Sequence, residues 1–574
     1  MIDHSPPRPR PGLAALALIT TLTASALADD PLRDMQAAYI ANKDEKLDRA
    51  YHFGSQGPGD VFSNHTSHSN RLVPVYVFGS KADLGAITGE NSPYRDRSKI
   101  KAFYGRIPPH TFNPEAEYGD QADLYHLQKD AVAKGAKYLF TVWFDGLDGE
   151  TLQAAAIART GEIYSEGKGS GLNFQDDEAH GTAQYGSIVT SPTFDKNVVD
   201  VDAQTVQIPA DSLSGGYDAD IAGPEAGVAG PLAPKAPGYL KGQSASSADR
   251  EGVRSVDRVL HAYTDSSCSA AEYANGVKSY NNGVNVADDG RFLRPLYHDL
   301  QADGWKVGTV TNVPFPHASP AALYARNVHR NDYQDIAREM LGLPGIVQET
   351  GKGELLPGLD VVIGTGFTYD PPTEAPRSQG ENAEPGNPFL APSDRQKIDL
   401  EQGGAYVVVE RSQGIKGSEG LLAAAERAAA EGLRLFGFYG TDDGHLPYET
   451  ADGNYDPTPG IRETAETYTE ADLLENPTLA EMTEAALRVL AAEPGQPFAL
   501  FVEAGDVDWA LHDNNLDNAI GAIYTGEKAI QVVIDWVEAH SNWDEAVLIV
   551  TSDHGHYLVI NDPEAIAGKA EPAP

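Results

Sequence analysis

Carboxylates and histidines gather in two short segments near the end of the chain. Glu503, Asp508 and His512 fall within ten residues, and Asp553 and His554 are adjacent to each other. Asp508 and His512 are four residues apart, so on a helix they share one face. Aspartate with histidine is a ligand set suited to zinc, whereas a glutamate among hydroxyls and water suits magnesium. The two segments therefore predict a centre for divalent metal ions.

A serine stands where a helix is expected to begin. The run from Thr264 to Ala271 (Thr-Asp-Ser-Ser-Cys-Ser-Ala-Ala) is small and rich in hydroxyls, and a helical stretch follows it. Ser266 would lie at the helix N-terminus, where backbone N–H groups and the helix dipole favour an anion. Taken alone, Ser266 is better explained as a plain N-cap residue. The two ligand segments near the end of the chain weaken that explanation.

Near-continuous apolar runs lead into these chemical groups. The runs 137–144, 498–502 and 546–550 each end at a cluster of carboxylates or histidines, the first of them at Asp145. Strands of this kind are buried on both faces, as in a parallel sheet covered by helices. Such sheets collect ligands at the carboxyl ends of their strands. The fold class predicted is therefore α/β, with a large, mostly parallel central sheet and helices on both faces.

Helical patterns and loop-like segments lie between the apolar runs. Helices are expected over 421–431, 479–492 and 526–540. The segment 209–247 is rich in Gly, Pro and Ala, and the segment 369–394 is rich in Pro, Glu and Asn. Both are predicted to be loop insertions in one catalytic domain.

The first 28 residues have the pattern of a secretory signal. Arg8 and Arg10 precede an apolar run over 13–22, and Ala26-Leu27-Ala28 is a small-x-small cleavage site. The apolar run is short for a membrane anchor, which needs about 20 residues. We therefore expect a signal peptide over 1–28, a single catalytic domain over 29–574, and a periplasmic or extracellular location.

Composition excludes some partners. The 574 residues include 84 acidic and 43 basic side chains, a formal net charge of -41. The electrostatic field of this negative net charge repels nucleic acid and anionic lipid, so neither is an expected partner. An anionic substrate stays open, because metal ions can reverse the sign of the charge inside a pocket. Cys268 is the single cysteine, so no internal disulfide is available.

Five ordered blocks resemble the signature segments of the alkaline phosphatase family. The resemblance covers roughly residues 138–560, interrupted by the two insertions, and it implies an alkaline-phosphatase-like fold. The blocks are Phe144-Asp145-Gly146-Leu147, the run Thr264 to Ala271, Pro316-His317-Ala318-Ser319-Pro320-Ala321-Ala322, the run Phe501 to Asn515, and Val550-Thr551-Ser552-Asp553-His554-Gly555-His556.

The resemblance also implies a role for each matching residue. Ser266 is the nucleophile, and Arg330 grips two phosphate oxygens in the bidentate manner of a guanidinium. Two zinc ions and one magnesium ion complete the site. The implied ligands of the first zinc are Asp508 and His512, and those of the second are Asp145, Asp553 and His554. Magnesium is held by Glu503 and Ser319, with Asp145 bridging to the second zinc and His317 acting nearby.

The activity implied is that of a secreted phosphomonoesterase working through a phosphoserine intermediate. Its partners would be small phosphomonoesters and inorganic phosphate, and the family resemblance suggests a homodimer. Two alternatives stay open. One is a phosphodiesterase or sulfatase of the same superfamily, whose nucleophile is often threonine or a modified cysteine. The other is a non-catalytic protein that binds phosphate or metal.

One family ligand is not in its usual place. The first zinc takes a third ligand, a histidine, from a segment downstream of the Asp-His block, and no histidine follows His556 in this sequence. The segment 64–79 is similar to that family segment, and counting back from its Val-Pro and Phe-Gly pairs selects His68, with His65 in reserve. Our hypothesis is a circularly permuted alkaline phosphatase, in which 29–130 holds the usual C-terminal segment.

Overall fold

The structure is a computed structural model. The predicted signal peptide, His65 and most of the first predicted insertion lie outside the residues that it describes. The described residues are 32–34, 36–37, 68–69, 71–164, 167–217, 261–374, 376, 378–460, 464–556, 558, 560 and 563–568.

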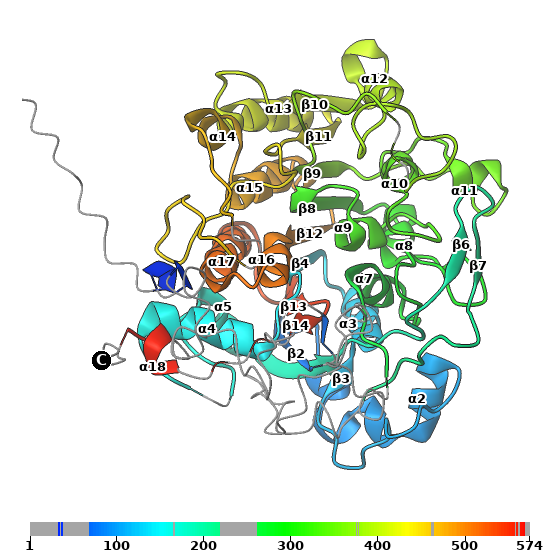
Figure 1. Ribbon diagram of the computed structural model, residues 1–574, viewed down its shortest axis with the longest axis vertical. Helices are drawn as coiled ribbons and strands as arrows, with labels where there is room; N and C mark the ends of the chain where they lie inside the picture. The colour runs from blue at the N-terminus through cyan, green and yellow to red at the C-terminus, as the bar shows by residue number, and fades with distance from the viewer. Residues whose placement is uncertain are drawn as a thin grey trace, which may run out of the picture.

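The centre of the described chain is a ten-stranded sheet (Figure 1). Seven strands from β10 to β13 are parallel, β2 runs antiparallel to both of its neighbours, and β3 pairs in parallel with β5. The prediction of a large, mostly parallel sheet is confirmed. In spatial order the strands are β10 (Tyr406–Glu410), β11 (Arg434–Phe438), β9 (Val361–Thr365), β8 (Lys306–Pro314), β12 (Phe498–Ala504), β4 (Tyr138–Phe144), β13 (Ala546–Ser552), β2 (Val73–Phe78), β5 (Gln184–Val189) and β3 (Gly119–Asp120).

The three predicted strands lie side by side in the middle of this sheet, as β12, β4 and β13. Every residue of the three is buried. Side chains of β4 alternate between two hydrophobic cores, with Phe140 and Val142 in one and Leu139 and Trp143 in the other. Burial on both faces explains why the sequence of these strands lacks polar alternation.

Helices cover both faces of the sheet (Figure 1). One core is shared with α4 (Gly149–Thr160), α13 (Gly417–Glu431), α15 (Leu479–Leu490) and α17 (Leu516–His540). The other is shared with α3 (Gln121–Ala133), α7 (Ser266–Asn275), α8 (Leu296–Ala302), α9 (Ala318–Ala322) and α10 (Tyr333–Met340). The remaining helices are α2 (Arg97–Tyr104), α5 (Asn173–Asp176), α11 (Ile346–Glu349), α12 (Pro392–Ile398), α14 (Glu470–Glu475), α16 (Asp506–His512) and α18 (Pro563–Ile566).

Several predicted boundaries differ from the structure. The helix expected over 421–431 begins at Gly417, and the helix expected over 479–492 ends at Leu490. The helix expected over 526–540 begins earlier, because α17 starts at Leu516. Its first part is apolar and buried on almost every side, so the sequence there lacks the alternating faces on which the prediction depended. The second predicted insertion ends earlier than residue 394, because Pro392 is the first residue of α12 and proline is well suited to that position.

Short elements lie outside the large sheet. The strands β1 (His68–Ser69) and β14 (Gly555–His556) pair with each other, as do β6 (Val198–Asp200) and β7 (Thr205–Gln207). The 3-10 helices are η3 (Leu84–Ala86), η4 (Gly89–Asn91), η5 (Pro93–Arg95), η6 (Ala179–Gly181) and η7 (Leu400–Gln402).

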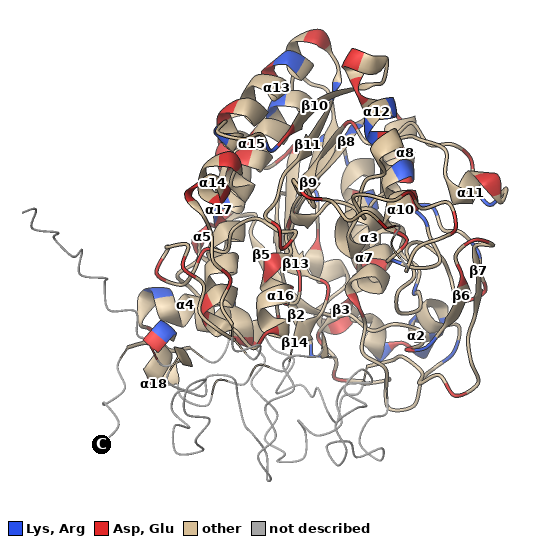
Figure 2. Cartoon of the chain, turned by 45° about the horizontal axis from the view of Figure 1, so that its top comes forward, with Lys and Arg blue, Asp and Glu red and all other residues tan. Residues whose placement is uncertain are grey.

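The acidic residues are spread over the described chain. Aspartate and glutamate occur on many of the helices and loops in view (Figure 2). Within the described part of the chain, no helix combines the length and the apolar character that crossing a bilayer requires.

A buried ion pair anchors the chain between β1 and β2. The guanidinium of Arg71 is fully buried and lies 3.2 Å from Asp148 Oδ2 and 3.5 Å from Glu150 Oε2. Asp148 also caps α4, since its carboxylate accepts from the backbone N–H groups of Glu150 and Thr151. Arg71 therefore ties the segment that carries His68 to the start of α4.

We expect Arg71→Ala to lower the free energy of unfolding by about 3–5 kcal/mol, because it leaves buried carboxylates without their cation. The measurement is the urea midpoint with its slope. Lys137→Ala is the matched control: it breaks the exposed pair with Glu545, which is 2.6 Å long, and should cost less than about 1 kcal/mol. Equal midpoints for the two variants would show that Arg71 is no anchor.

Candidate active site

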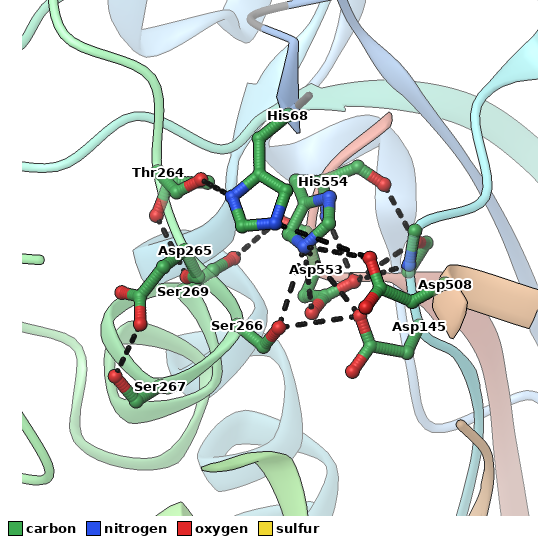
Figure 3. A network of polar contacts seen from close by, with 12 residues as sticks. His68, Asp145, Thr264, Asp265, Ser266, Ser267, Ser269, Asp508, Asp553 and His554 are labelled. Atoms are coloured by element: carbon green, nitrogen blue, oxygen red, sulfur yellow. Dashed lines mark hydrogen bonds and ion pairs between the residues drawn. The ribbon is translucent and has the colours of Figure 1, made fainter. Parts of the chain in front are cut away.

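Ser266 lies at the start of α7, as its sequence predicts. Asp265 is the N-cap, and its carboxylate accepts from the backbone N–H of Cys268. The Ser266 hydroxyl is buried, 3.2 Å from Asp145 Oδ1 and 3.3 Å from His554 Nε2 (Figure 3). The serine therefore faces an aspartate and a histidine from two different strands.

The sheet register brings these two strand ends together. β4 and β13 are parallel neighbours whose pairing ends at Phe144 opposite Ser552. The next residues, Asp145 and Asp553, therefore leave the sheet at the same edge. His554 Nε2 lies 3.4 Å from Asp145 Oδ1 and 3.5 Å from Asp553 Oδ2. Asp145, Asp553 and His554, here called the serine-side group, are close enough to share one metal ion.

A second group surrounds Asp508. Its Oδ1 atom lies 2.7 Å from His556 Nε2, 3.3 Å from His512 Nε2, 3.8 Å from His554 Nε2 and 3.9 Å from His68 Nε2. Asp508 and His512 share a face of α16, as their spacing predicts. We call Asp508, His512, His556 and His68 the histidine-rich group. Asp508, His512 and His556 are close enough to share a metal ion, and His68 is close enough to share one with Asp508 and His554.

His68 reaches this group through the pairing of β1 with β14, which sets His68 opposite His556. Its Nδ1 lies 2.8 Å from the carbonyl oxygen of Thr264, so Nδ1 donates a proton there. That tautomer leaves the lone pair on Nε2, which lies 3.2 Å from His512 Nε2. The ring also stacks on His554, with 3.9 Å between centroids (Figure 3). His68 is thus oriented as a metal ligand is.

The turn after β4 must contain glycine. Gly146 has φ +77°, and a Cβ there would lie 2.9 Å from His556 Nε2 and 3.0 Å from the Cα of Asp508. A side chain would therefore push α16 and β14 away from Asp145. The Asp-Gly pair at the strand end brings the two ligand groups together.

Electrostatics prepare the imidazoles as ligands. Burial, aided by nearby histidines, lowers the pKa of His554 to about 3 and holds the pKa of His68 well below its usual value. Burial works against ionisation of Asp508, but the imidazoles of His512 and His556 outweigh it and keep its pKa low. Neutral imidazoles at His68 and His554 beside an ionised Asp508 are the protonation states that metal binding requires.

A cluster of oxygen ligands lies beside these groups. Burial, with the charge of Asp553, raises the pKa of Glu503 to about 8, and burial with Asp553 and Asp508 raises the pKa of Asp145. Glu503 Oε1, Ser319 Oγ and Asp553 Oδ2 are buried and make no hydrogen bond within the described structure. Buried oxygens of this kind fit a hard cation such as magnesium, whose charge would stabilise the ionised carboxylates.

Arg330 and Ser266 share one anchor. The Arg330 guanidinium lies 2.9 Å from Asp265 Oδ2, and the Ser267 hydroxyl donates to the same oxygen at 2.8 Å. Asp265 also caps the helix that begins with Ser266. Its pKa is low because Arg330 and hydrogen bonds outweigh the effect of burial. The arginine is therefore fixed in direction close to the serine, as a phosphate clamp requires.

His317 is placed differently from the other predicted residues. Its ring stacks on Tyr333, with 5.3 Å between centroids and 13° between planes, and it also contacts Phe389 and Trp509. Among the described residues, it belongs to none of the His/Asp ligand groups. A role for His317 at the magnesium site stays a prediction.

Sequence reasoning did not include His556 among the ligands, although it stands two residues after His554 in the same block. Its contact with Asp508 depends on where β14 lies. Thr264 was also missed, because its contribution is a backbone carbonyl that accepts from His68. A main-chain acceptor leaves no signal in residue type.

Comparison with known proteins identifies the family. The sequence model described as alkaline phosphatase matches residues 248–570, more than half of the chain. The chain belongs to the alkaline phosphatase family. The match includes every ligand-bearing segment from Ser266 onward, while Asp145 and His68 lie before it.

Individual relatives are distant. The chain is 28% identical over 316 residues to the membrane-bound alkaline phosphatase of Bombyx mori. That alignment covers 52% of this chain and 51% of the Bombyx mori protein. The chain is 28% identical to alkaline phosphatase H of Pseudomonas aeruginosa, covering 53% and 60%. The crystal structure of Thermus thermophilus alkaline phosphatase matches 74% of this chain and 60% of its own, with 21% identity and a TM-score of 0.40. The alignments thus span about half to three fifths of these relatives' lengths.

Proposed function

We propose that this protein is a metal-dependent phosphomonoesterase whose nucleophile is Ser266. One observation carries the proposal: the Ser266 hydroxyl lies within 3.3 Å of both Asp145 and His554, and Arg330 is held beside it by Asp265. A nucleophile, a ligand group and a phosphate clamp thus meet at one point. Family membership supports the same reading, since the match covers Ser266 and Arg330.

The ligands fit two zinc ions and one magnesium ion. The serine-side group would hold one zinc and the histidine-rich group the other, while Glu503 and Ser319, with Asp145, would hold magnesium. Nitrogen with carboxylate ligands suits zinc, and the oxygen set suits magnesium. When bound, these ions would lower the pKa of the Ser266 hydroxyl and stabilise negative charge on the leaving oxygen.

The residues of the chain divide the reaction into two displacements. Ser266 Oγ attacks phosphorus while the bond from phosphorus to the alcohol oxygen breaks. The proton of the serine hydroxyl passes to solvent, and the leaving oxygen takes up a proton and departs as the alcohol. Arg330 holds two of the phosphoryl oxygens by paired N–H donors, which fixes the phosphorus in line with Oγ. Water then attacks the phosphoserine, releasing inorganic phosphate and restoring the Ser266 hydroxyl.

His68 would complete the zinc site of the histidine-rich group. We propose that the segment with β1 (His68–Ser69) and β2 (Val73–Phe78) supplies what the family takes from its C-terminal segment. β2 lies next to β13 in the sheet, so this segment lies beside the Asp553 block despite its distance in sequence. This supports a circular permutation of the family order. We also retain export to the periplasm or outside the cell, and a homodimer, as proposals.

The test compares two chromogenic substrates, 4-nitrophenyl phosphate and bis(4-nitrophenyl) phosphate. With zinc and magnesium present, kcat/KM for the monoester should exceed that for the diester by about a hundredfold or more. EDTA should abolish turnover, and zinc with magnesium should restore it. Preference for the diester would assign the protein to the phosphodiesterases of the superfamily. Bound zinc with no turnover of either ester would indicate a binding protein.

A further inference from the structure

Four aromatic rings from separate segments meet near Arg330. His317 precedes α9, Tyr333 begins α10, Phe389 comes from the second predicted insertion, and Trp509 lies in α16. The centroid of His317 is 5.3 Å from Tyr333, 5.9 Å from Phe389 and 5.5 Å from Trp509, and Tyr333 is 5.2 Å from Phe389. We call these four residues the ring cluster.

The ring cluster borders the catalytic centre. Trp509 directly follows Asp508, and together with Asp508 and His512 it lines a cavity of about 690 Å³. Arg330 stands three residues before Tyr333, the first residue of α10, which places this ring close to the phosphate clamp.

The ring cluster lies at the edge of the hydrophobic cores: Trp509 packs against one and Phe389 against the other, and neither is fully buried. All four of its side chains are half-buried, so part of their surface remains open to solvent. By contrast, Phe315 and Phe438 are buried in the core beneath. Half-exposed aromatic rings beside a reaction centre can stack on a flat ring of a ligand. Such stacking requires a suitable ring geometry but accepts rings of different chemical identity.

We propose that the ring cluster is a substrate subsite that binds a planar ring carried by the alcohol of the phosphomonoester. The proposal rests on the proposed function. It selects substrates such as nucleoside 5′-monophosphates over esters of alcohols without a ring. Phe389 gives the second predicted insertion a role in this selection, because that segment supplies one of the four rings.

The experiment compares adenosine 5′-monophosphate with ribose 5-phosphate, which have the same reacting bond and differ in the base. We expect kcat/KM to favour the nucleotide by about tenfold, as stacking of one base allows. Phe389→Leu should reduce this preference to about twofold or less while kcat/KM for ribose 5-phosphate stays unchanged. Phe389→Tyr, which keeps the ring, should retain the preference.

Phe367→Leu is the matched control. Phe367 is also partly buried, but it packs on Tyr369 and Phe438 and lies outside the ring cluster, so its replacement should leave the preference intact. Equal kcat/KM for the two substrates in the unmodified protein would overturn the subsite. Equal loss of kcat/KM on both substrates in Phe389→Leu would overturn the subsite too, because the preference for the nucleotide would then not depend on the Phe389 ring. Absence of hydrolysis of both esters would overturn the proposed function itself, and the subsite with it.

Discussion

Replacement of Ser266 by alanine is expected to lower kcat for 4-nitrophenyl phosphate by at least about a thousandfold. The reason is that the hydroxyl facing Asp145 and His554 is the atom that forms the bond to phosphorus. The metal ligands are unaffected, so zinc content should stay the same. Stability should change by only about 1 kcal/mol, because a single hydrogen-bonding hydroxyl is removed.

Ser267→Ala is the control for this variant. Ser267 is also buried and also lies in the first turn of α7, but its hydroxyl donates to Asp265 rather than facing the ligand groups. Its loss should change kcat by no more than about tenfold. If Ser266→Ala kept its rate while Ser267→Ala lost it, the nucleophile would be assigned to the wrong serine.

Replacement of His68 by alanine is expected to weaken zinc binding by at least about a hundredfold, since even residues that only orient a metal ligand contribute about 10–100-fold to affinity. At limiting zinc, turnover should fall in proportion, and added zinc should restore part of it. The measurements are zinc content after dialysis and the dependence of rate on free zinc. His68→Cys should recover much of the affinity, because a thiolate is also a zinc ligand.

His126→Ala serves as the comparison for His68. His126 is exposed on α3 and belongs to none of the ligand groups in the described chain, so its loss should leave zinc content unchanged. Unchanged zinc content and rate in His68→Ala would remove the basis for the circular permutation. The segment 68–78 would then be an ordinary edge of the fold that happens to approach the site.

The middle of the sheet was accessible from sequence because burial on both faces leaves a clear signature. The runs that became β4, β12 and β13 are continuously apolar and stop at polar residues, so both the strands and the positions of Asp145, Glu503 and Asp553 could be predicted. The spacing of four residues was likewise enough to predict that Asp508 and His512 lie on the same face of a helix.

Long-range pairings could not be predicted in the same way. His556 joins Asp508 because β14 pairs with β1, and those two strands come from opposite ends of the chain. The ring cluster depends on two loop residues and two helices meeting in space. The family resemblance implies a metal role for His317, whose ring packs on Tyr333. Periodicity describes the neighbourhood of a residue along the chain, and these contacts depend on tertiary arrangement.

The most direct test of the account is to find the phosphate on the enzyme. The protein, loaded with zinc and magnesium, is quenched in acid during turnover of a phosphomonoester, digested and mapped by mass spectrometry. We expect a phosphate on the peptide that begins α7, located at Ser266 and absent from Ser266→Ala. Turnover accompanied by a phosphate on a different residue, or by the same phosphopeptide in Ser266→Ala, would contradict it.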